Sequence, residues 1–139
     1  MKIFFGQIYV DPGVKFTFTH RFQKFIGGEI SSIVKPSDKF INEYGEDFDL
    51  IFRVSAKRDI TDVDIKGPTV FKKDKDVEFT IFLPFDSDQP SLRDGNRRPL
   101  ELLLGAVVGV LNKLEIDTKF LQERMGVFMD AVMADPSMI

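Results

Sequence analysis

The feature that most constrains the fold is an alternating stretch in the middle of the chain. Between residues 77 and 85, every second side chain is large and apolar, and the positions between them carry Glu78, Thr80 and Pro84, with Phe82 as the one large apolar exception. Successive side chains of a β-strand point to opposite faces, so this stretch predicts a strand with one face in a hydrophobic core. The apolar set is Val77, Phe79, Ile81, Leu83 and Phe85.

Further strands are predicted on both sides of this one. Residues 49–57 place Leu50, Phe52 and Val54 on one face and polar residues on the other, and residues 60–66 and 69–73 have a similar but shorter pattern. A polar turn at residues 73–76 leads into the alternating strand. Short strands joined by turns are typical of an antiparallel meander, so we expect antiparallel pairing here.

The first third of the chain predicts a strand and leaves a second element open. Residues 2–10 are apolar on both faces, which favours an interior strand over an edge strand. In residues 14–34, apolar side chains recur at helical spacing after Thr19, a candidate helix N-cap. Against a helix, Gly27-Gly28 costs about 2 kcal/mol relative to two alanines and allows a hairpin to turn there. Helix and hairpin both remain open, with the helix favoured.

Two helices are predicted at the C-terminal end. Residues 99–114 are apolar almost all round and indicate a buried helix, in which Gly105 and Gly109 would allow close approach to the sheet or to another helix. Residues 117–134 carry Met125, Met129 and Met133 on one side, which favours a core face over an adaptable binding surface. Residues 136–139 are expected to form a loose tail.

These elements predict one α+β domain over residues 1–139. Its architecture would be two-layered: an antiparallel β-sheet meander packed on one face by helices, with an N-terminal strand plus helix and two C-terminal helices. With 15 Phe and no Trp, the core is expected to consist of phenylalanine rings packed edge to face.

Composition excludes several classes of function. The chain has no cysteine, so it has no disulfide framework, thiolate metal site or cysteine nucleophile. A net charge of −3 and the lack of a basic face argue against a nucleic-acid partner. No secretory signal is visible at the start, and no segment predicts a membrane span, so we expect a cytoplasmic protein with no membrane partner.

Candidate catalytic and metal-binding residues are few. His20 is the only histidine, and a general base would need a carboxylate and a nucleophile beside it, so a surface position near a helix start is expected instead. An EF-hand count from Asp86 puts Ser91 where glycine is needed and Arg97 where glutamate is needed. We therefore expect no metal site, no cofactor and no enzymatic activity.

One segment resembles a known class of proteins. It consists of Lys66-Gly67-Pro68, followed by Lys72-Lys73-Asp74-Lys75 and the alternating strand. The pattern of this segment is similar to that of small immunity proteins of bacterial polymorphic-toxin and contact-dependent growth inhibition systems. The order of strands and helices is similar too. The resemblance implies a non-enzymatic protein that binds one cognate toxin and occludes its active site. It implies no particular contact residues.

Two charged loops, at residues 44–47 and 86–98, are the candidate toxin-binding surface, because they are long and not needed for packing. Their candidate contact residues are Tyr44, Glu46, Asp47, Asp86, Asp88, Arg93, Asp94, Arg97 and Arg98. Two other functions stay open: a small-ligand or enzymatic domain that uses His20, and a structural homodimer subunit that associates through the methionine stripe and Phe82. The binder itself would be a monomer or a homodimer.

Overall fold

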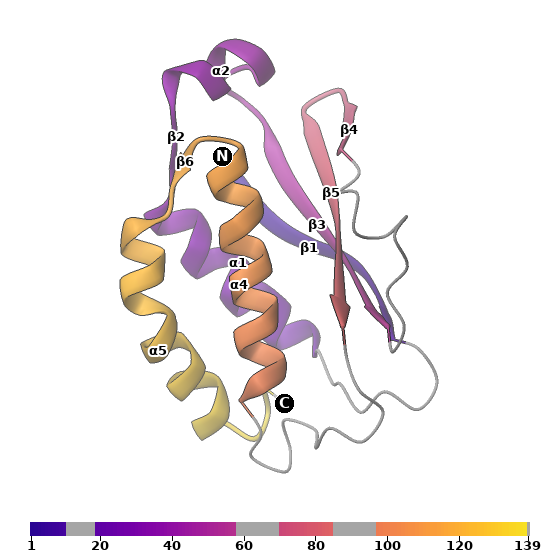
Figure 1. Cartoon of the computed structure of the whole chain (residues 1–139), viewed down its shortest axis with the longest axis vertical. Helices are drawn as coiled ribbons and strands as arrows, with labels where there is room; N and C mark the ends of the chain where they lie inside the picture. The colour runs from indigo at the N-terminus through magenta and orange to yellow at the C-terminus, as the bar shows by residue number, and fades with distance from the viewer. Residues whose placement is uncertain (11–18, 58–69, 85–96, 139) are drawn as a thin grey trace.

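The computed structural model describes residues 1–10, 19–57, 70–84 and 97–138. Two sheets and a layer of helices make up these residues (Figure 1). The predicted strand at residues 60–66 lies outside the described residues. The elements follow in the order β1 (Lys2–Val10), α1 (His20–Ile33), β2 (Lys35–Pro36), α2 (Asp38–Tyr44), β3 (Asp49–Lys57), β4 (Val70–Lys73), β5 (Asp76–Pro84), α4 (Arg98–Lys113), β6 (Ile116–Asp117) and α5 (Lys119–Ala134).

The main sheet is mostly parallel, so the predicted antiparallel meander is wrong. Its strand order is β1-β3-β5-β4, with β1 parallel to β3 and β3 parallel to β5. Among the described strands of this sheet, only β4 and β5 pair antiparallel, through the tight turn at which Asp74 has a φ of 52°. The short strands β2 and β6 pair antiparallel in a separate sheet. Parallel neighbours need a crossover connection, and between β1 and β3 the helices α1 and α2 supply it. The expectation that strands joined by short turns pair antiparallel is therefore correct for β4 and β5 but not for the sheet as a whole.

The helices cover one face of this sheet, as expected. In Figure 1, α1 and α4 lie over the same face, and α5 packs against both of them. The buried face of β3 and β5 is the one that the alternation predicted, and no residue of it is more than 5% exposed. It consists of Leu50, Phe52, Val54, Ala56, Val77, Phe79, Ile81 and Leu83.

A row of phenylalanine rings crosses the buried face. The centroids of Phe5 and Phe52 are 5.9 Å apart, and those of Phe52 and Phe79 are 6.0 Å apart. In both pairs the ring planes are tilted by 33°, so the predicted edge-to-face packing is wrong for this row. Strand register aligns the three residues, because Phe52 pairs with Phe5 on one side and Phe79 on the other.

The opposite face of the sheet is not covered by any described helix. On β1, Phe4 is 46% exposed and Tyr9 is 59% exposed. An ion pair of 2.9 Å joins Arg53 of β3 to Glu78 of β5 on this face. The prediction that β1 is an interior strand is therefore wrong: β1 lies at the edge of the sheet, and part of its second apolar face is exposed.

Residues 20–33 form a continuous helix, which decides between helix and hairpin. Thr19 is the N-cap, and its hydroxyl accepts the backbone N–H of Phe22 at 3.1 Å. Phe22, Ile26 and Ile30 are completely buried. Burying a large apolar side chain stabilises by about 1.5–3 kcal/mol, so three of them outweigh the cost of about 2 kcal/mol of two helical glycines.

The glycines of α4 do not mediate close packing. Leu100, Leu103 and Val107 are among its buried side chains, whereas Gly105 and Gly109 are exposed. A Cβ added at either glycine would have nothing within 4 Å. The predicted close approach at these two positions is therefore wrong, because they lie on the outer face of the helix.

The C-terminal tail is anchored rather than loose. The Thr19 hydroxyl donates to the carbonyl oxygen of Met138 at 2.6 Å, and Arg21 forms an ion pair of 3.4 Å with Asp135 and a hydrogen bond with Ser137. These contacts hold the end of α5 beside the start of α1. The methionines of α5 are half-buried and pack against the core, as the core interpretation predicted; they are Met125, Met129 and Met133.

Candidate functional site

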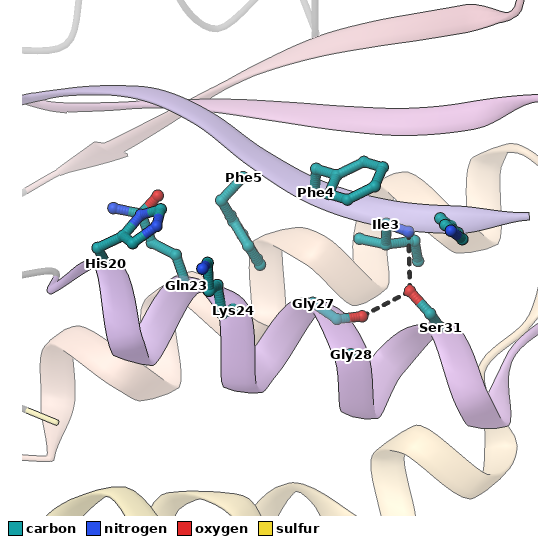
Figure 2. A pocket seen from close by; sticks show the side chains of 10 residues that line it. Ile3, Phe4, Phe5, His20, Gln23, Lys24, Gly27, Gly28 and Ser31 are labelled. Atoms are coloured by element: carbon teal, nitrogen blue, oxygen red, sulfur yellow. Dashed lines mark hydrogen bonds between the residues drawn. The ribbon is translucent and has the colours of Figure 1, made fainter.

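A groove with a volume of about 400 Å³ runs between the edge strand β1 and the helix α1 (Figure 2). Residues 2–5 of β1 form one wall, and side chains and glycines of α1 form the other. Its surface is mainly apolar. The groove exists because α1 lies along the free edge of the sheet.

At one end of the groove, helix and strand are in direct contact. The Ser31 hydroxyl accepts the backbone N–H of Ile3 at 2.8 Å and donates to the carbonyl oxygen of Gly27 at 2.6 Å (Figure 2). A Cβ at Gly27 would lie only 2.6 Å from the carbonyl oxygen of Ile3. Such a contact is shorter than real Cβ atoms make, so the close approach requires glycine here.

Toward His20 the groove widens, because strand and helix diverge (Figure 2). The Phe5 ring points into the space between them, and it is half-buried. Gly28 is exposed, and a Cβ built on it would meet nothing within 4 Å. The missing side chain at Gly28 therefore leaves the groove open.

The rim of the groove is cationic. The two lysines that line it, Lys2 and Lys24, are exposed, and none of the described lining residues is acidic. Neither lysine has an ion-pair partner within the described ranges. Unpaired cations around an apolar floor favour an anionic, partly apolar ligand.

The groove follows the first half of β1, not the carboxyl ends of the parallel strands. The parallel strands β1, β3 and β5 all end at the side of the molecule where α1 begins (Figure 1). In open parallel sheets, ligands usually bind outside the carboxyl ends of the strands. The strand residues that line the groove are 2–5, so this general rule does not place a ligand in it.

Among the residues that the structure describes, the groove does not assemble the constellation that an enzymatic use of His20 requires. His20 and Ser31 both line it, but they lie about three helical turns apart, roughly 16 Å at 1.5 Å per residue. The Ser31 hydroxyl is already bonded on both sides. His20 is the exposed first residue of α1, which confirms its predicted position at a helix start. Within the described ranges, no three acidic or histidine side chains are grouped to hold a metal ion.

The described parts of the two predicted contact loops, residues 44–47 and 97–98, lie at opposite ends of the molecule (Figure 1). The loop after α2 is at the end where the parallel strands begin, and the start of α4 is at the end where they finish (Figure 1). Arg97 and Arg98 are therefore at the same end of the molecule as the start of α1, but they do not line the groove, and Tyr44, Glu46 and Asp47 follow α2 at the opposite end. Four candidate residues lie outside the described residues: Asp86, Asp88, Arg93 and Asp94.

The described residues of these loops contact neighbours in their own part of the fold. The Tyr44 ring lies 4.5 Å from that of Phe40, and burial, followed by the charge of Glu43, raises the pKa of Tyr44. A hydrogen bond of 2.7 Å from Lys75 lowers the pKa of the Asp47 carboxyl. Glu46 is exposed.

At the other end, the two arginines of the predicted surface that lie in the described residues, Arg97 and Arg98, form ion pairs. Arg97 contacts Asp130 of α5 at 2.7 Å, and Arg98 contacts Glu101 at 3.6 Å, one turn further along α4. These pairs hold the start of α4 but leave both arginines partly exposed.

The patch predicted for a homodimer is not continuous. The methionine stripe of α5 belongs to the helix layer, whereas Phe82 alternates with the buried residues of β5 and so belongs to the opposite face of the sheet. These residues therefore do not form one surface.

The sequence contained one signal for the groove, and it was the glycine pair at 27–28. Glycine inside an apolar helical pattern usually has a packing reason. Here Gly27 allows contact with the strand, and Gly28 leaves the space next to it empty. Locating that space required knowing that β1 is the edge strand.

Comparison of the chain with protein-family models, with curated proteins and with solved structures found no match. None of the described helices is long and apolar enough to cross a membrane. What the molecule does is therefore inferred from its surfaces.

Proposed function

We propose that this chain is a non-enzymatic, cytoplasmic protein-binding module whose β1–α1 groove receives a segment of its partner. The observation that supports this most is the apolar groove at the edge of the sheet, whose two rim lysines have no ion-pair partner among the described residues. Three of its helix residues, His20, Lys24 and Gly28, are exposed, so the groove is open along its outer side. Small-molecule sites usually enclose most of their ligand, and an open groove is better suited to a polypeptide.

The narrower proposal is that the partner is a bacterial toxin and that the chain is its immunity protein. Its support is the resemblance of residues 66–85 to such proteins. Binding would occlude the active site of the toxin, with an apolar anchor in the groove and charged residues around it providing specificity. Of the predicted contact residues, Arg97 and Arg98 are the ones that could provide such charge, because the start of α4 lies at the end of the molecule where α1 begins (Figure 1).

The test is a calorimetric titration with the product of the adjacent upstream gene, using two matched variants. Gly28→Leu fills the groove, and Gly109→Leu makes the same change on the outer face of α4. Both glycines are exposed and helical with open space beside them, so both changes raise helix propensity alike. We expect Gly28→Leu to weaken binding by at least about tenfold, in line with the loss of one anchor contact, and Gly109→Leu to leave it unchanged.

Tight binding that neither variant alters would remove the groove from the interface. The double reversal Arg97→Glu, Arg98→Glu then asks whether the predicted loop region carries the contact instead. If the upstream product does not bind at all, the toxin proposal fails, and the binding module has to be tested with the peptide described below.

A further inference from the structure

We infer that the segment bound by the groove is an extended stretch of a partner protein in which acidic and apolar side chains alternate. This inference rests on the proposed function and specifies the chemistry of the partner. It follows from the charge of the rim, the nature of the floor and the shape of the groove.

The charge of the rim departs from that of the whole chain. Acidic residues outnumber basic ones, 22 to 19, yet the described lining contains two lysines, Lys2 and Lys24, and no acidic residue. A local excess of positive charge on an acidic protein attracts an anionic partner and disfavours a cationic one. The side chains that face the rim should therefore be glutamate or aspartate.

The floor of the groove is apolar and rigid. Ile3 is buried, and Phe5 is the outermost ring of the row that continues through Phe52 and Phe79. Rings held in such a row need no reordering to receive an apolar side chain, which reduces the entropic cost of binding. The empty space beside Gly28 is where that side chain would be placed.

The shape that the described residues give the groove indicates an extended segment that enters from the His20 end. Helix and strand touch at Gly27 and Ser31, which closes one end, and they diverge toward His20 (Figure 2). An extended chain directs successive side chains to opposite sides. One set would then face the apolar floor and the other the cationic rim, which gives the alternating pattern.

The experiment uses fluorescence anisotropy with a labelled eight-residue peptide that alternates glutamate and leucine, and a matched peptide that alternates lysine and leucine. We expect the glutamate peptide to bind at least about tenfold more tightly, and its binding to weaken between about 50 mM and 300 mM salt. Equal affinity for the two peptides would overturn the inference. So would binding of dodecanoate with no binding of either peptide, since the ligand would then be a small amphipathic carboxylate.

Two pairs of variants locate the peptide. Gly28→Leu should abolish binding of the glutamate peptide, and Gly109→Leu should not change it. Lys24→Glu should weaken binding about fivefold to tenfold, as expected for reversing one exposed charge, whereas Lys119→Glu should have no effect. Lys119 is a fair control because it too is exposed on a helix without an ion-pair partner among the described residues. Binding that survives both Gly28→Leu and Lys24→Glu would refute the assignment to the groove.

The inference and the proposed function can fail separately. If the upstream gene product binds in a manner sensitive to Gly28→Leu while the glutamate peptide does not bind, the inferred chemistry is wrong and the function stands. If the peptide binds in the groove and the upstream product does not, the groove chemistry stands and the toxin proposal falls.

Discussion

The closed end of the groove depends on the contact between Gly27 and Ile3, and Gly27→Ala tests that contact. The added Cβ would lie 2.6 Å from the Ile3 carbonyl oxygen, about 0.8 Å inside the 3.4 Å at which ordinary contact begins. The atom that it meets belongs to the backbone of a paired strand, so it cannot turn away as a flexible side chain would. Either α1 or β1 has to shift, and the hydrogen bond of 2.8 Å between Ile3 and Ser31 shifts with it.

The expected magnitude follows from two opposing effects. Overpacking of this kind costs about 1–3 kcal/mol, and replacing a helical glycine by alanine gains about 1 kcal/mol. Gly28→Ala makes the same chemical change one residue later, with nothing within 4 Å of the new Cβ, so only the gain applies there. The difference in unfolding free energy between the two variants therefore isolates the steric cost, about 1–3 kcal/mol in favour of Gly28→Ala.

Urea unfolding of both variants and the unchanged protein measures this difference directly. In thermal unfolding, each kcal/mol corresponds to about 4 °C in Tm for a chain of this size. A Gly27→Ala protein as stable as Gly28→Ala would mean that α1 does not lie against the Ile3 carbonyl. In that case the closed end of the groove, and the direction in which a segment enters it, would be wrong.

Three further predictions follow from individual contacts. Ser31→Ala should reduce the free energy of unfolding by about 1–2 kcal/mol in urea titration, because it removes the hydrogen-bond partner of the Ile3 N–H. Ser32→Ala should leave the free energy of unfolding nearly unchanged, because Ser32 is exposed and, among the described residues, its hydroxyl bonds only within its own helix. Phe52→Ala should cost about 3–5 kcal/mol, since Phe52 is completely buried between two other rings, and a smaller loss would argue against the ring row. Hydrogen bonds from the side chain and then the backbone of Ser137 lower the pKa of the Asp135 carboxyl below its ordinary value of 3.8. The stabilising effect of the ionised carboxylate is therefore fully present above pH 3.8 and is lost as the pH falls through the lowered pKa. Carboxyl NMR titration should show that lowered midpoint, and Ser137→Ala should move it back toward 3.8; an unchanged midpoint would mean that the Ser137 hydroxyl does not hydrogen-bond to the Asp135 carboxyl.

Features that depend on near neighbours in the chain were predictable from the sequence alone. The buried faces of β3 and β5 follow from alternation with a period of two, and Thr19 was recognisable as a cap from the helical pattern after it. The methionine stripe of α5 was correctly expected on the core side. Each of these is decided within a few residues by side-chain direction and apolar content.

Tertiary structure decided which strands pair, in which direction, and where the free edge lies. Alternation does not specify the neighbour of a strand, so a meander in sequence order was predicted, whereas β3 pairs directly with β5 and is parallel to it. The sequence also does not distinguish a glycine that packs against another backbone from one that faces open space. Gly27 is of the first kind and Gly109 of the second. The groove combines these two undetermined features, since it needs β1 at the edge and α1 against it. For that reason, the sequence shows the residues of the groove but does not predict that they lie next to one another.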